Sequence, residues 1–168
     1  SSFLMETKLD FGKDNMGKDW KVINDGVMGG LSEGEIEITE NSLKFSGSIS
    51  LKNFGGFTSV KSPFLSQDLS NSKKVKIRYR TNNQAIAISL ENSKEFYKPY
   101  FKMILPNTDN QWKTVEKSIE EFRENRLGQE TSAKISNEFL KSIQRIGFIT
   151  NQKKEGDFVV EIDYIKFE

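Results

Sequence analysis

The residues that could do chemistry in this 168-residue chain are carboxylates, lysines, arginines and tyrosines, because it contains no histidine and no cysteine. That composition excludes a Ser-His-Asp triad, a cysteine nucleophile and the usual ligands of structural zinc. Glu33 with Glu35, and Glu120 with Glu121, are candidate glycosidase pairs, which must face each other across a cleft. Neighbouring glutamates in a charged chain more often form a solvated face. We therefore expect no enzyme activity.

Net charge and hydropathy narrow the choice of partner. The 25 basic and 24 acidic side chains nearly cancel, so no excess of positive charge indicates a nucleic-acid partner. No apolar run approaches the roughly 20 residues that span a bilayer. We expect a soluble, cytoplasmic protein that forms one domain over residues 1–168.

One segment concentrates glycine. Residues 23–34 read INDGVMGGLSEG and hold four of the twelve glycines, a density that indicates tight turns or the close approach of another group. The spacing is not that of a dinucleotide site or a P-loop, and a helix is not predicted to follow. The segment fits a turn-rich loop between strands, either purely structural or with a polar rim open to a partner.

The elements that must position these residues are mainly short strands, indicated by alternating apolar residues between turn signals. The expected strands are 8–11, 20–24, 35–39, 42–51, 57–64, 74–80, 85–91, 97–105, 112–118, 145–151 and 157–167. Glu40-Asn41 predicts a tight turn, and Asn82-Asn83 a hairpin, because asparagine tolerates the left-handed conformation. A change of alternation predicts a β-bulge near Tyr164.

Two segments favour short helical connectors, 119–125 and 136–143, the second with Ser136 as N-cap. Many short strands with so little helix predict an all-β fold, an antiparallel jelly-roll sandwich. We assign Trp20 and Trp112 to its core.

Three groups of motifs resemble a known family. The first is Trp20-x-x-x-Asn24-Asp25-Gly26-Val27-Met28-Gly29-Gly30-x-Ser32. The second comprises Phe45-x-Gly47 and Asn53-x-Gly55-Gly56-Phe57-x-Ser59-Val60. The third comprises Trp112-x-x-Val115, Ile146-Gly147-Phe148 and Gly156-x-Phe158-x-x-Glu161-Ile162-Asp163-x-Ile165. In this order they are similar to the complex I intermediate-associated protein 30 family, from about Leu9 to Phe167.

The resemblance implies a galactose-binding-like β-sandwich and kinship with a mitochondrial factor that helps assemble respiratory complex I. We expect a partner-binding rim that combines the two glycine blocks with the strand after the second. Its residues are Asn24, Asp25, Met28, Gly29, Gly30, Ser32, Asn53, Gly55, Gly56 and Lys61. Lys61 stands where the family commonly has arginine, whose planar fork lysine cannot reproduce. Residues 80–84 keep only the first arginine of the family's Arg-Gly-Asp-Gly-Arg hairpin.

Two ligand sites are candidates, the first from the same resemblance and the second from the aromatic residues. Galactose-binding-like modules often hold calcium near their paired terminal strands, so Asp10 and Asp163 are candidate ligands of a structural calcium ion. Ordinary exposed or capping roles are the alternative. Tyr97, Tyr100 and Arg80 are candidate sugar-binding residues, because a planar ring matches the apolar face of a pyranose.

We therefore predict a non-enzymatic binding or assembly module that recognises a protein partner, by resemblance a respiratory-complex subunit. A carbohydrate-binding module is the alternative, although a β-sandwich alone does not decide between these functions.

Overall fold

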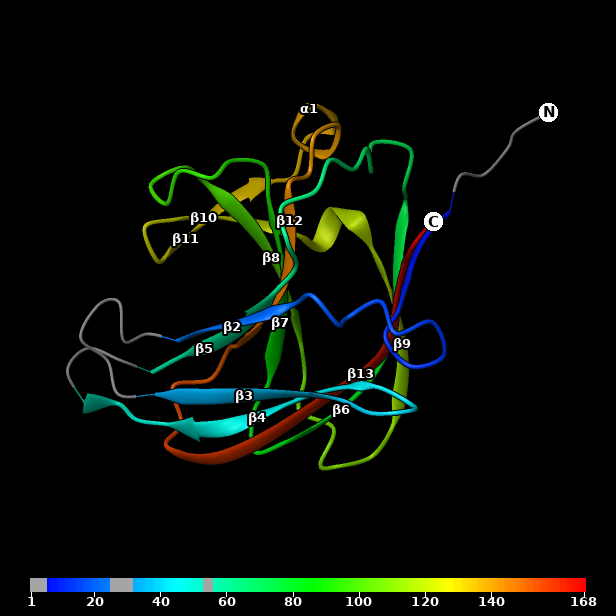
Figure 1. Cartoon of the computed structure of the whole chain (residues 1–168). Coiled ribbons are helices and arrows are strands. Elements are labelled where there is room, and N and C mark those ends of the chain that lie inside the picture. The colour runs from blue at the N-terminus through cyan, green and yellow to red at the C-terminus, as the bar shows by residue number, and fades with distance from the viewer. Residues whose placement is uncertain (1–5, 25–31, 53–55) are drawn as a thin grey trace.

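Two antiparallel β-sheets packed face to face make up the protein, as a computed structural model that describes residues 6–24, 32–52 and 56–168 shows (Figure 1). The six-stranded sheet contains β1 (Thr7–Asp10), β3 (Glu33–Ile38), β4 (Leu43–Ile49), β6 (Lys74–Asn82), β9 (Lys113–Ser118) and β13 (Gly156–Phe167). The seven-stranded sheet contains β2 (Lys21–Asn24), β5 (Thr58–Lys61), β7 (Ile86–Glu91), β8 (Tyr100–Leu105), β10 (Arg123–Arg126), β11 (Gln129–Lys134) and β12 (Arg145–Thr150). The predicted all-β sandwich is confirmed.

The strand order distributes neighbours in sequence between the sheets. The first sheet runs β3-β4-β13-β6-β9 with β1 also paired to β13, and the second runs β11-β10-β8-β7-β12-β5-β2. Most consecutive strands therefore lie in different sheets; for example, the chain crosses from one sheet to the other between β6 and β7 and between β12 and β13. Because β1 pairs with β13, the first strand lies beside the last, and both ends of the described chain lie on one side of the fold (Figure 1).

The core lies between the sheets and is rich in aromatic rings. Trp20 stacks on Phe148 at 5.5 Å, and Phe11 meets Trp20 edge-on at 4.9 Å. Tyr79 is fully buried and donates its hydroxyl to the Pro106 carbonyl at 2.7 Å. Because burial disfavours the phenolate, it raises the pKa of Tyr79 to about 12.

Several predictions of local structure are confirmed. The Glu40-Asn41 turn joins β3 to β4. The pairing of β13 with β6 shifts register between Ile162 and Tyr164, where a bulge was predicted. Ser136 caps the short helix α1 (Asn137–Leu140), since its Oγ accepts a hydrogen bond from the Phe139 amide at 3.1 Å.

Three predictions are wrong. Asn83 has the expected positive φ of 68°, but the link it occupies joins strands of different sheets and is not a hairpin. The segment 119–125 starts as the 3-10 helix η3 (Ile119–Glu121) and then continues as the unpredicted strand β10, which pairs with the unpredicted β11. Trp112 lies on the outer face of the six-stranded sheet, where two arginines cover it, and not in the core.

Candidate functional site

Two of the described residues predicted to form one rim, Asn24 and Lys61, lie at opposite ends of the strand pair β2–β5. Asn24 pairs with Thr58 at one end of β2 and β5, and Lys61 pairs with Lys21 at the other. Near the Asn24 end, Ser32 is buried, and its hydroxyl accepts from the Ser50 amide at 3.1 Å. Gly56 adopts a φ of 135°, which side-chain-bearing residues rarely adopt. Asp25, Met28, Gly29, Gly30, Asn53 and Gly55 lie outside the described residues.

Lys61 belongs to a cluster that we call the charged end, formed by Lys61, Glu91 and Arg145. Arg145 donates through Nε and Nη2 to the two carboxylate oxygens of Glu91 at 3.1 and 3.0 Å. Lys61 Nζ lies 3.1 Å from Glu91 Oε2. The three side chains are 16 to 19% exposed. Since they stand on the adjacent strands β5, β12 and β7, the sheet itself fixes their positions before any partner arrives.

Three exposed aromatic residues form what we call the aromatic rim: Phe64 lies against Arg145 and Lys94, and the loop that directly follows Glu91 carries Phe96 and Tyr97. Their exposed fractions are 47%, 89% and 53%. Phe96 meets Tyr97 edge-on at 5.8 Å. The guanidinium of Arg145 lies over the Phe64 ring at 4.7 Å and links the rim to the charged end. Exposed aromatic rings beside arginine are the composition typical of the energetically dominant part of protein–protein interfaces.

A central strip of small residues crosses the outer face of the same sheet, formed by Ser59, Ala87, Ser89 and Gly147. Register places Gly147 between Ser89 of β7 and Lys61 of β5, and it places Ile149 between Ala87 and Ser59. A Cβ atom at Gly147 would lie 2.8 Å from Ser89 Oγ and 2.9 Å from Lys61 Cγ. Gly147 therefore leaves the room that the Ser89 hydroxyl and the lysine stem occupy.

Two larger side chains of β8 border the central strip. Lys102 donates to Asn151 Oδ1 at 3.0 Å, and burial lowers the pKa of Lys102 because it disfavours the ammonium form. Burial, and then the charge of Glu91, raise the pKa of Tyr100. This border is thus partly desolvated and polar.

The outer face of the six-stranded sheet carries a cavity of about 600 Å³ that we call the arginine pocket. Arg78 Nη1 donates to Asp163 Oδ2 at 2.9 Å, and Arg80 donates through Nε at 3.0 Å and through Nη2 to Glu161 Oε1. The two guanidinium groups lie 4.4 and 5.0 Å from the centre of the Trp112 ring. Arg78 and Arg80 are two residues apart on β6, so their side chains lie on the same face of the sheet.

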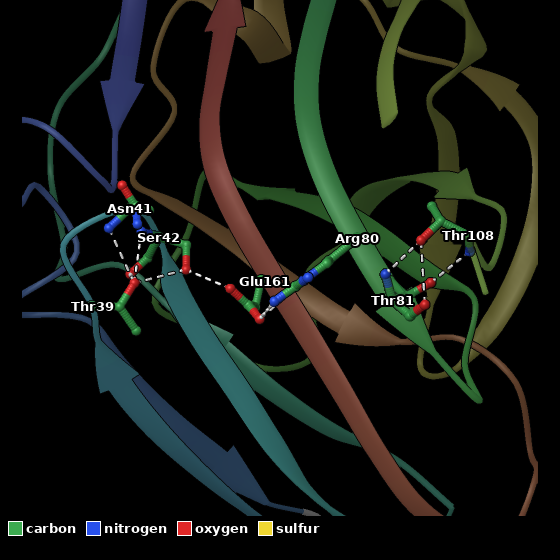
Figure 2. A network of polar contacts seen from close by, with 7 residues as sticks. All are labelled: Thr39, Asn41, Ser42, Arg80, Thr81, Thr108 and Glu161. Carbon is green, nitrogen blue, oxygen red and sulfur yellow. Dashed lines mark hydrogen bonds and ion pairs between the residues drawn. The ribbon is translucent and has the colours of Figure 1, made fainter. Parts of the chain in front are cut away.

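Figure 2 shows how further hydrogen bonds complete this pocket. Ser42 donates to the second oxygen of Glu161 at 2.8 Å, and the turn residue Thr39 contacts Ser42 Oγ at 3.0 Å. On the far side of Arg80, Thr81 and Thr108 bond each other twice, from each amide to the opposite hydroxyl, at 2.8 and 2.9 Å. This pair holds the segment that leads to Trp112 and β9.

The candidate sugar-binding residues do not meet. Arg80 lies in the arginine pocket on one sheet, whereas Tyr100 and the loop that carries Tyr97 belong to the other. Tyr97 is exposed, whereas Tyr100 is half-buried.

The candidate calcium ligands have other partners. Asp163 is paired with Arg78, and Asp10 Oδ1 accepts from the Gly12 amide at 3.1 Å. Within the described part of the chain, no three or more acidic, histidine or cysteine side chains gather as a metal site would require. The calcium site stays a prediction, since backbone carbonyls would have to supply most of its ligands.

Comparison with known proteins identifies the family. A model of the family described as Complex I intermediate-associated protein 30 (CIA30) matches residues 9–162, which is nearly the whole chain. The chain belongs to the CIA30 family. No curated protein sequence matches this CIA30 chain. No helix among its described residues is long and apolar enough to cross a membrane.

Solved structures similar to the CIA30 chain include carbohydrate-binding modules and an agarase. One is the family 11 module of the cellulosomal cellulase Lic26A-Cel5E of Clostridium thermocellum, with a TM-score of 0.69 and 22% identity over 99% of this chain and 95% of that one. The Clostridium thermocellum family 11 module in complex with a beta-1,3-1,4-mixed-linked tetrasaccharide gives 0.67 and 21%, over 99% and 96%. An agarase, AgWH50C, gives 0.61 and 12% over 96% of this chain and 24% of that one. At such identities the likeness establishes the fold.

Proposed function

We propose that this CIA30 chain is a non-enzymatic module that binds a protein partner through the aromatic rim and the charged end. The observation that carries the proposal is the position of three exposed aromatic rings beside a charge cluster that the sheet has already ordered. Large exposed rings gain most from burial against another protein, and their few rotatable bonds lose little entropy.

The partner that we propose is a subunit of a respiratory complex at an unfinished stage of assembly. The family description, which names an intermediate of complex I, supports this choice. In this mechanism the rim covers an apolar surface that the partner buries only in the finished complex. The charged end then sets the orientation of docking, because its ion pairs need no rearrangement. Long-range steering is weak, since the net charge is +1.

The test is cross-linked recovery of the tagged protein from its native host, with solubilised membranes included. We expect Phe96→Ala with Tyr97→Ala to lower the yield of respiratory-complex subunits about tenfold, as loss of an interface hot spot does. Leu51→Ala is the control, since Leu51 is also exposed, at 42%, but lies beside Gly56, near the Asn24 end of β2 and β5. Loss with Leu51→Ala and not with the rim variant would contradict the proposal.

A carbohydrate is the second candidate ligand, and the arginine pocket favours it. Its guanidinium and carboxylate groups are held in fixed planes beside the Trp112 ring, an arrangement that suits neutral hydroxyl groups. A glycan array with and without calcium tests it. We expect Trp112→Ala to abolish any binding seen, and an array without binding would reject this candidate.

We also propose structural calcium near Asp10 and Asp163 as a separate prediction. A melting temperature that rises in excess calcium and falls with a chelator would support it, and an unchanged melting temperature would remove it.

A further inference from the structure

The Ser89 hydroxyl is a buried polar group without a partner. Ser89 is 0% exposed, and its Oγ forms no hydrogen bond within the described residues. Ile88 and Leu90 point into the core, so Ser89, which alternates with them on β7, points to the outer face. A buried hydroxyl without a partner lowers stability, because its hydration is lost and no hydrogen bond replaces it. Such a group in a folded protein requires an explanation.

Lys102 stands next to Ser89 on the neighbouring strand, and within the described residues its ammonium group has no ion-pair partner. Register pairs Lys102 of β8 directly with Ser89 of β7, so both side chains stand on the same face. The described hydrogen bond of Lys102 is to the neutral amide of Asn151, and none of the described carboxylates forms an ion pair with it. Partly buried cations are normally paired, since the loss of hydration is otherwise not offset.

The surrounding face is basic. Lys21, Lys61, Arg123 and Arg145 stand on the strands to either side of Ser89 and Lys102, at register positions of the same face. Glu91 is already held by Lys61 and Arg145. Burial lowers the pKa of Lys102 by more than the charge of Glu130 on β11 raises it. The face therefore complements an acidic partner, although the chain as a whole is nearly neutral.

We propose that a carboxylate side chain of the protein partner binds above the central strip, where it accepts hydrogen bonds from Ser89 Oγ and Lys102 Nζ. This inference rests on the proposed function and names the chemistry that the partner supplies. A carboxylate is an acceptor with negative charge, so it satisfies both groups at once. A neutral sugar hydroxyl satisfies Ser89 and leaves the ammonium without a counter-ion.

Entry of the carboxylate requires two side-chain movements: the Lys102 ammonium leaves Asn151 and turns toward Ser89, and the Lys61 stem moves aside. The Lys61 stem passes over Gly147 beside Ser89 Oγ, with Lys61 Cγ near the point where a Gly147 side chain would begin. Lys61 has several rotatable bonds and can swing away while its ammonium stays near Glu91. The site is also continuous with the aromatic rim through Tyr100, the neighbour of Lys102 on the same face.

The experiment uses a carbodiimide, which joins an ammonium group and a carboxylate in direct contact by an amide bond. The full-length protein is treated in two settings, with a synthetic peptide of alternating glycine and glutamate, and in solubilised membranes of the native host. We expect mass spectrometry to find Lys102 joined to a glutamate or aspartate in both. Lys102→Met should lower the peptide affinity about tenfold, the effect of one charge-assisted hydrogen bond. Lys76→Met, on the outer face of the other sheet, should leave it unchanged.

Each outcome decides one of the two proposals. Joining through other lysines with Lys102 free, or equal affinity of Lys102→Met and wild type, would overturn the carboxylate site. If the rim variant loses the respiratory subunits while Lys102→Met retains them, the proposed function stands and this inference fails. If no subunit is recovered but the peptide joins to Lys102, the carboxylate site stands and the proposed partner fails. A peptide in which glutamine replaces glutamate should show no affinity above background, and equal affinity would also overturn the site.

Discussion

The outer faces of the two sheets differ in how completely their charged and polar side chains are paired. On the six-stranded sheet, Arg78 and Arg80 each have a carboxylate, and Glu161 is satisfied on both oxygens by Arg80 and Ser42. On the seven-stranded sheet, neither a partner for the Ser89 hydroxyl nor a counter-ion for Lys102 is found among the residues that the structure describes. The same sandwich thus has a completed polar network on one side and an incomplete one on the other.

The difference separates stability from binding. A satisfied network of partly buried ion pairs holds its strands together, and removal of one member leaves a charge without its partner. An unsatisfied group lowers stability in the free protein, and a partner that satisfies it gains that free energy on binding. We infer that the arginine pocket mainly stabilises β6 against β13, and that the seven-stranded face is the one that binds.

The largest expected effect comes from removing one charge on each face. Glu161→Gln should lower the free energy of unfolding by about 2 kcal/mol, because Arg80 keeps its charge without a counter-ion; the partial exposure of Arg80 at 32% limits the loss. Lys102→Met should change it by less than about 0.5 kcal/mol, since no ion pair is broken. Urea denaturation of both variants measures the difference. Equal losses would remove the distinction between the faces.

A smaller effect is expected from a matched pair of serine variants. Ser42 and Ser89 are both 0% exposed, but Ser42 donates to Glu161 at 2.8 Å. Ser42→Ala should lower the free energy of unfolding by about 1 to 2 kcal/mol, whereas Ser89→Ala should leave it unchanged or raise it slightly. Thermal melts of the two variants check this. A large loss from Ser89→Ala would show that the hydroxyl has a partner in solution and would weaken the case for an incomplete face.

The smallest effect is a pH dependence from Lys102. Burial lowers the pKa of Lys102 in the folded protein below the usual 10.5. At a pH between the folded and the unfolded pKa, the unfolded chain therefore binds more protons than the folded one. The contribution of Lys102 to stability therefore increases as pH rises through that window. We expect the free energy of unfolding of wild type relative to Lys102→Met to rise toward pH 10.5. Both should carry Tyr100→Phe, since the raised pKa of Tyr100 makes its contribution fall at high pH. A flat difference would contradict the desolvation of Lys102.

Sequence patterns predicted the parts of the fold that depend on local alternation. Val75, Ile77 and Tyr79 alternate through β6, and all three are buried. Strands β10 and β11 escaped prediction because their arginine, asparagine, glutamate and glutamine residues have low strand propensity, and pairing with β8 decides their conformation. The wrong hairpin prediction at Asn83 has a related cause. The sequence correctly indicated the positive φ of Asn83, which is a local property, but the sheet that the next strand joins depends on contacts throughout the chain.

The candidate site was harder to predict because its contacts are distant in sequence. Glu91 and Arg145 are 54 positions apart, and nothing near either one indicates the pair. One signal was present in the sequence. Ala87 and Ser89 occupy the outward positions of an apolar strand, and Gly147 does the same in Ile146-Gly147-Phe148, which indicates a strip without large side chains. The prediction that Trp112 lies in the core was wrong because the ring packs against the guanidinium groups of two arginines on the outer face.

The most direct test of the central claim, that the incomplete face binds the partner, compares Lys102→Met with Lys76→Met. Both lysines are partly exposed and stand on outward positions of opposite sheets. The measurement is the amount of respiratory-complex subunits that each variant retains after cross-linking in native membranes, quantified by mass spectrometry against wild type. The account predicts a loss of about tenfold for Lys102→Met and none for Lys76→Met. Equal retention by both variants, or loss with Lys76→Met alone, would contradict it.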